Sequence, residues 1–177
     1  AAAAAENVSV GAASDEGRHV GPVVNATQYN KIQDLIQKGI DEGARLVAGG
    51  IGRPEGFNKG FYVRPTVFAD VENSMTIAQE EIFGPVLSII PFETEEEAIA
   101  LANDTVYGLT NYIQTQDQDK AKRVARSLRS GMVEMNGHTR GAGAPFGGMK
   151  QSGNGREGGK WGIEDFLELK SVAGWVD

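Results

Sequence analysis

Residues 86–90 (VLSII), 111–114 (NYIQ) and 132–135 (MVEM) decide the fold of this chain. Each segment has the short length and the apolar or aromatic content typical of a strand. Two helical segments separate them: a capping box at residues 94–97 (TEEE) starts the first, and residues 120–129 carry the apolar stripe of the second. Strands and helices that alternate with short links favour right-handed crossovers and parallel pairing. We therefore expect an α/β fold with three layers, in which helices flank a mostly parallel sheet.

The part of the chain before these segments predicts one long helix and two short strands. Residues 25–28 (NATQ) match a capping box, and apolar residues at helical spacing follow, so a helix is expected over residues 26–42. Residues 46–48 form a short apolar run typical of a buried strand. Residues 61–68 are strand-like, but Pro65 predicts an edge strand or a break.

The part after residue 135 predicts a long loop and two short elements. Residues 136–159 are too rich in glycine for regular structure, and long loops in compact domains are often functional. Ligands of parallel sheets bind outside the carboxyl ends of the strands, so residues just after Met135 are site candidates. A short helix is expected at residues 160–166. Residues 167–172 (LELKSV) alternate apolar and polar positions, which predicts a half-buried strand free to pair with another subunit.

Composition excludes several classes of function. The 177 residues are 40% hydrophobic, enough for a folded core, and none of the apolar runs approaches the roughly 18–20 residues of a membrane span. A net charge of −7 argues against nucleic-acid binding. The chain has no cysteine, which excludes disulfides, thiolate metal sites and cysteine catalysis within it. His19 and His138 lack partners at metal-ligand spacing, which favours structural or surface positions for both.

Residues 153–158 (GNGREG) fit the glycine pattern of a dinucleotide fingerprint letter for letter. That fingerprint needs a strand before it and an acid about 20 residues after it. A glycine-rich loop, residues 145–152, precedes it instead, and the sequence ends at Asp177. A tight turn that leads into the terminal helix is therefore favoured over a phosphate cradle, and a stand-alone nucleotide-binding domain is disfavoured.

Five segments in this order resemble the C-terminal half of an NAD(P)-dependent aldehyde dehydrogenase. They cover essentially the whole chain: residues 21–24 (GPVV), 60–67 (GFYVRPTV), 80–85 (EEIFGP), 102–109 (ANDTVYGL) and 145–157 (PFGGMKQSGNGRE). The resemblance implies oxidation of an aldehyde to a carboxylic acid with NAD or NADP. Residues 1–166 then correspond to the C-terminal part of the catalytic domain, and residues 167–177 to an oligomerisation strand and tail.

The resemblance also implies residue roles. Glu81 matches the glutamate that accepts hydrogen bonds from the nicotinamide ribose hydroxyls, and a carboxylate suits a diol because it offers two acceptor oxygens. Phe83 matches the aromatic ring beside that ribose and the nicotinamide. Phe146 matches a wall of the aldehyde tunnel. Glu157, the catalytic candidate, matches an acid that relays protons from the general base to solvent.

One further implied site is for potassium. Lys150 and Gly153 match positions whose backbone binds this ion in the betaine-aldehyde branch of the family. His138 and Arg140 depart from the pattern, because relatives often place apolar substrate contacts in that loop. Polar side chains at these two positions suit a polar or anionic substrate, but this one loop does not determine the substrate class.

The cysteine nucleophile, the glutamate general base, the oxyanion-hole asparagine and the Rossmann domain of the family all lie upstream of the position that matches Ala1. We therefore expect this chain alone to be inactive, and its partners to be an N-terminal Rossmann half, an aldehyde and further copies in a dimer or tetramer. Nucleic acid and membrane are not expected as partners, and the expected location is cytoplasmic. The alternative is a non-catalytic truncated module that acts through residues 167–172.

Overall fold

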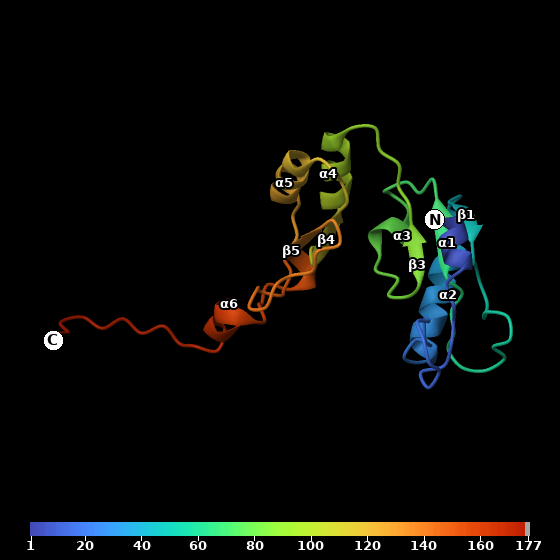
Figure 1. Cartoon of the computed structure of the whole chain (residues 1–177), viewed down its shortest axis with the longest axis horizontal. Helices are drawn as coiled ribbons and strands as arrows, with labels where there is room; N and C mark the ends of the chain where they lie inside the picture. The colour runs from blue at the N-terminus through green and yellow to red at the C-terminus, as the bar shows by residue number, and fades with distance from the viewer. Residues whose placement is uncertain (176–177) are drawn as a thin grey trace. The chain divides into compact units, whose positions relative to one another are not determined.

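The structure of the chain is a computed structural model and describes residues 1–175 (Figure 1). The chain divides into two compact units, unit 1 (Ala1–Phe92) and unit 2 (Glu93–Asp177). None of the helices described is both long and apolar enough to cross a membrane. The boundary predicted between residues 166 and 167 separates the catalytic-domain part from an oligomerisation strand and tail. It stays a prediction.

Unit 1 combines three helices with a three-stranded sheet. Its elements are α1 (Ala2–Glu6), α2 (Ala26–Asp41), β1 (Arg45–Ala48), β2 (Thr66–Ala69), α3 (Thr76–Gln79) and β3 (Val86–Ser88). The strand order is β1-β2-β3, in which β1 pairs antiparallel with β2 and β2 pairs parallel with β3. Strand β2 begins directly after Pro65, which confirms the predicted break at that residue.

Helix α2 forms where its capping box predicts. The Asn25 side chain accepts a hydrogen bond of 2.9 Å from the backbone N–H of Gln28, which satisfies one of the unpaired donors of the first turn. The helix ends at Asp41, with Glu42 as its C-cap, and Gly43 follows with φ +93°. A residue in this left-handed region terminates a helix, and glycine occupies it without steric cost.

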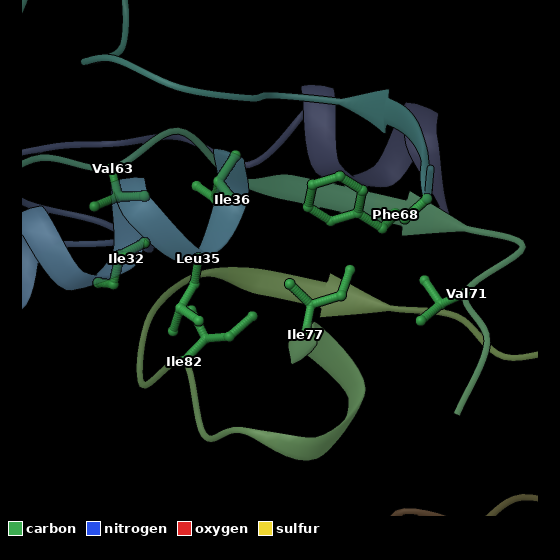
Figure 2. Packing of buried hydrophobic residues seen from close by; sticks show 9 residues of the cluster. Ile32, Leu35, Ile36, Val63, Phe68, Val71, Ile77 and Ile82 are labelled. Atoms are coloured by element: carbon green, nitrogen blue, oxygen red, sulfur yellow. The ribbon is translucent and has the colours of Figure 1, made fainter. Parts of the chain in front are cut away.

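The core of unit 1 lies between α2, the sheet and α3. Figure 2 shows Ile32, Leu35 and Ile36 of α2 in one cluster with Phe68 of β2 and Ile77 of α3. The buried cluster comprises Ile32, Leu35, Ile36, Ala44, Val63, Phe68, Val71, Ile77 and Ile82. Because Ile82 belongs to this cluster, the loop between α3 and β3 is anchored in the core.

Unit 2 contains a two-stranded sheet and short helices. Its elements are α4 (Glu95–Asn103), β4 (Thr110–Ile113), α5 (Gln118–Ser127), β5 (Met132–Met135), the 3₁₀ helix η1 (Lys150–Ser152) and α6 (Gly159–Glu164). Strands β4 and β5 pair in parallel with α5 as the connection, as predicted. Strand β3 pairs with β2 and does not join β4 and β5. The alternating strands and helices expected over residues 86–135 therefore contribute to two separate sheets.

Residues 167–175 differ from the prediction, since none of them lies in a helix or strand. The strand predicted at residues 167–172 is therefore not formed in the single chain, and its pairing with another subunit stays a prediction. A strand needs a hydrogen-bonded neighbour, and the described part of the chain provides none for this segment. Leu167 and Leu169 are consequently exposed to solvent.

Candidate functional site

The first candidate region is the loop of residues 80–85, between α3 and β3 in unit 1. Its central residue, Ile82, is 8% exposed and belongs to the core cluster. On either side of it, Glu81 is exposed and the Phe83 side chain is 70% exposed. One buried anchor therefore leaves a carboxylate and an aromatic ring at the surface of a fixed loop.

The backbone of this loop has an unusual conformation. Phe83 has φ +55°, in the left-handed region that residues with a Cβ rarely adopt. The next residue, Gly84, lies against α2 so closely that a Cβ there would come within 2.6 Å of Ile32 Cδ1. Strained conformations persist where the surroundings hold them, and they concentrate at functional sites.

Two side chains of α2 hold this loop from outside the core. Gln28 donates from Nε2 to the carbonyl oxygens of Ile82 (2.9 Å) and Phe83 (3.2 Å). Lys31 donates from Nζ to the carbonyl oxygen of Glu81 (2.8 Å). All three bonds go to the backbone, so they fix the loop without using the Glu81 carboxylate. Sequence reasoning noted Gln28 only for its capping box and missed Lys31, since polar residues on a helix face carry no signal of a distant partner.

The second candidate region is the glycine-rich loop of unit 2. Phe146 and Glu157 form an isolated antiparallel bridge in which each backbone N–H donates to the carbonyl of the other at 2.7 Å. The structure thus brings together the predicted substrate residue and the predicted proton-relay residue. Nothing in the sequence indicated this pairing.

Close backbone approaches involve some of the glycines in and beside this loop. A Cβ on Gly131, which directly precedes β5, would overlap the carbonyl of Gly147. Arg156 completes the packing, because its Nη1 donates to the carbonyl oxygens of Gly148 (2.6 Å) and Gly155 (2.9 Å). The loop is therefore closed by backbone contacts that only glycine permits and by one arginine.

Lys150 joins the same loop to the end of α4. Its Nζ donates to the carbonyl oxygens of Asn103 (2.9 Å) and Thr105 (3.0 Å), at the helix end where a positive charge is favourable. Its own carbonyl accepts the backbone N–H of Gly153 at 3.2 Å within the 3₁₀ turn. This 3₁₀ turn, and not a strand, precedes residues 153–158, and α6 follows them, as the tight-turn interpretation predicted.

A hollow of about 560 Å³ lies beside β5 in unit 2. Besides β5 it is lined by Asn136, His138, Thr139, Arg140 and Pro145. This is where ligand sites of parallel strands are expected, just after Met135. Asn136 ties the two strand ends together, because its Oδ1 accepts the backbone N–H of Thr115 at 2.9 Å.

One residue that lines this hollow, Arg140, places positive charge beside an aromatic ring. The Arg140 guanidinium carbon lies 4.7 Å from the centroid of the Phe146 ring, within the range of a cation–π contact. Among the described residues, the His, Asp and Glu side chains do not form a cluster of three or more that could hold a metal ion. The potassium site predicted at Lys150 and Gly153 involves backbone oxygens and stays a prediction.

Comparison with known proteins decides the family. The model of the aldehyde dehydrogenase family matches residues 1–172. The chain belongs to the aldehyde dehydrogenase family. This confirms the family predicted from the five sequence segments, and with it an oxidoreductase family.

Individual relatives of the chain are also aldehyde dehydrogenases. The chain is 54% identical over 170 residues to a putative aldehyde dehydrogenase of Staphylococcus saprophyticus, covering 96% of this chain and 36% of that protein. A crystal structure of an aldehyde dehydrogenase from Bartonella henselae is 61% identical with a TM-score of 0.95, covering 98% of this chain and 36% of that one. A mutant aldehyde dehydrogenase C from Pseudomonas syringae, complexed with NAD+ and octanal, is 49% identical with a TM-score of 0.96 and coverages of 99% and 36%.

These comparisons confirm the α/β class and limit what the chain represents. This aldehyde dehydrogenase chain spans 36% of the length of the relatives above. It therefore corresponds to part of their fold.

Proposed function

We propose that this chain supplies part of the active site of an aldehyde dehydrogenase that oxidises an aldehyde to a carboxylic acid with NAD+ or NADP+. The observation that carries the proposal is the loop of residues 80–85. Its backbone is held by α2 through three hydrogen bonds, while Glu81 and Phe83 stay exposed. An exposed carboxylate and an exposed aromatic ring on one fixed loop suit a ribose diol and a flat heterocycle.

Each site residue has a role in this proposal. Glu81 accepts hydrogen bonds from the ribose hydroxyls, and Phe83 packs beside the nicotinamide. Phe146 lines the path of the aldehyde, and Glu157, bridged to it, passes protons towards solvent. The bound dinucleotide supplies the hydride acceptor.

The nucleophile is not among these residues. The chain has no cysteine, and the thiolate chemistry of the family requires one. Residues 1–177 alone are therefore proposed to be inactive, with the nucleophile and the Rossmann half supplied by other residues of a complete enzyme. Potassium at the carbonyls of Lys150 and Gly153, a homo-oligomer and a cytoplasmic location belong to the same proposal and rest on the resemblance.

A second candidate function is that of a non-catalytic module that assembles through residues 167–172. The observation that favours it is the exposure of Leu167 and Leu169 in a segment without a neighbouring strand. Deletion of residues 167–177 tests the assembly role that both candidates give this segment, whereas turnover of the chimera described below separates the two candidates. It removes self-association measured by sedimentation if the segment is an assembly strand, and leaves the sedimentation coefficient of each species unchanged if it is not.

A chimera tests the proposed function directly. This chain replaces the matching part of the Bartonella henselae enzyme, to which it is 61% identical. We expect the chimera to reduce NAD+ or NADP+ in the presence of aldehydes, while this chain alone does not. A folded chimera without turnover, next to an active parent enzyme, would contradict the proposal.

A further inference from the structure

The Glu42 side chain caps the N-terminus of helix α3, although Glu42 and Thr76 lie 34 residues apart in the sequence. Its Oε2 accepts the backbone N–H of Thr76 at 2.7 Å, and its Oε1 accepts the Thr76 hydroxyl at 2.6 Å. The residue at the N-cap position, Met75, has no side-chain acceptor to offer. A one-turn helix is marginal without such support, so this carboxylate replaces the missing local cap.

The same residue of α3 connects Glu42 to the candidate cofactor loop. The Thr76 carbonyl accepts the backbone N–H of Glu80 at 2.9 Å, and Glu80 directly precedes Glu81. A continuous series of hydrogen bonds therefore runs from Glu42 through Thr76 to the first residue of the loop.

Glu42 is itself held in place. It is the C-cap of α2, with its backbone N–H bonded to the Lys38 carbonyl at 2.9 Å, and the Lys38 ammonium lies 3.8 Å from its Oε1. The Glu42 side chain is 25% exposed. The hydrogen bonds from the Thr76 hydroxyl and backbone lower the pKa of Glu42, so the carboxylate is ionised at neutral pH.

Helix α2 thus supports the loop at both of its ends. Gln28 and Lys31 near its N-terminus bind the carbonyls of residues 81–83. Glu42 at its C-terminus fixes the helix that precedes them. Between these ends, Leu35 of α2 lies beside Ile82 of the loop (Figure 2).

We propose that Glu42 is a positioning residue for cofactor binding, which holds Glu81 in register through Thr76. The proposal rests on the proposed function, because it assigns the dinucleotide to the Glu81 loop. Glu42 touches neither substrate nor cofactor. Its effect is on the geometry of the loop, and therefore on the affinity for NAD+ or NADP+ more than on turnover.

The chimera with the Bartonella henselae enzyme provides the kinetic test. Glu42→Ala removes both acceptors, and we expect KM for the dinucleotide to rise about tenfold while kcat changes less than about threefold, as for a loss of charge-assisted hydrogen bonds. Glu42→Gln keeps one acceptor in place and restores most of the loss. Asp41→Asn, which removes a charge at the same helix end away from α3, is the matched control and leaves KM unchanged.

A second pair of variants keeps the proposal testable if Glu42→Ala does not fold. Thr76→Val loses the 2.6 Å hydroxyl bond and Thr76→Ser keeps it. Thr76→Val raises KM and Thr76→Ser does not. In the double variant Glu42→Gln with Thr76→Val, the effects are less than additive, because both changes break the same contact.

Hydrogen exchange on the 177-residue chain separates this proposal from the proposed function. Thr76→Val accelerates exchange of the amides of residues 77–83 and leaves those of β1 unchanged. Accelerated exchange without a change in KM would overturn the assignment of the cofactor to this loop. Unchanged exchange and unchanged KM would overturn the role of Glu42 alone.

Discussion

The two units hold their candidate regions by different means. All the buried apolar side chains among the described residues lie in unit 1, except for Ala121 of α5. The loop with Glu81 and Phe83 is therefore fixed to an apolar core through Ile82. Burial of apolar surface is non-directional and depends little on salt, so added salt should affect this loop less than it affects unit 2.

Unit 2 relies on polar bonds and close backbone contacts instead. Lys150 binds two carbonyls at the end of α4, and Arg156 binds the carbonyls of the glycine-rich loop. Arg123 and Glu95 join α5 to α4 by two bonds of 2.7 and 2.8 Å. We therefore expect single polar changes and salt to affect the Phe146–Glu157 bridge more than they affect the loop of unit 1.

The largest expected effect is on the core of unit 1. Phe68 is fully buried, and Phe68→Ala should lower the free energy of unfolding by about 3–5 kcal/mol, from lost burial and the cavity left behind. Phe92, 58% exposed at the end of the same unit, is the control, and Phe92→Ala should cost less than about 1 kcal/mol. Urea titration measures both; equal losses would show that the buried core of unit 1 does not determine its stability.

A backbone contact of unit 2 comes next. Gly131→Ala places a methyl group against the Gly147 carbonyl, and relief of this overlap should cost about 1–3 kcal/mol. Gly141 has open space around it, so Gly141→Ala is the control and should leave stability almost unchanged. Indistinguishable urea midpoints for the two variants would show that the glycine-rich loop is looser than the structure indicates.

Loss of the Lys150 side-chain bonds should have a smaller effect. Lys150→Met keeps the aliphatic stem and removes both bonds to the α4 end, which should cost about 1.5 kcal/mol. Faster amide exchange at Phe146 and Glu157 should accompany it. Lys170→Met, at an exposed position, is the control; if it has the same effect, the bonds of Lys150 do not hold the loop.

The smallest expected effect depends on pH. The Arg123 guanidinium lowers the pKa of Glu95, and backbone N–H groups of Lys120 and Asp119 lower that of Asp117. Their folded pKa values lie below the unfolded ones, so their stabilisation is present above the unfolded pKa and is lost as pH falls through the folded pKa.

Acid titration of stability tests this sign. Glu95→Gln should flatten the loss of unfolding free energy between about pH 5 and pH 3, and added salt should weaken the difference. Glu96→Gln, an exposed carboxylate on the same turn, is the control. A steeper loss in Glu95→Gln than in the parent chain would contradict the assigned direction.

Sequence predicted those features that local bonds determine. The N-cap bonds predicted at Asn25 and Thr94 both form, at 2.9 and 3.1 Å from the backbone N–H of the residue three positions on. Strand β5 has the predicted bounds, residues 132–135. Such signals work because the interacting groups lie within one turn or one strand.

Contacts between distant segments escaped prediction. The partner of β3 is β2 and not β4, and the Glu42–Thr76 bond spans two helices. Neither leaves a pattern in the local sequence, since many partners satisfy an apolar strand or a carboxylate equally well. The strand predicted at residues 167–172 does not form in the single chain for a related reason: alternation favours a strand but cannot supply a neighbour, and pairing with another subunit stays a prediction.

The central claim is that the Glu81 carboxylate binds the dinucleotide. The most direct measurement is KM for NAD+ and NADP+ in the chimera, for Glu81→Gln beside Glu80→Gln as the adjacent control. We predict a rise of about tenfold or more for Glu81→Gln, because one charged acceptor is lost, and no change for Glu80→Gln. Equal KM values for Glu81→Gln and the parent chimera would contradict the account.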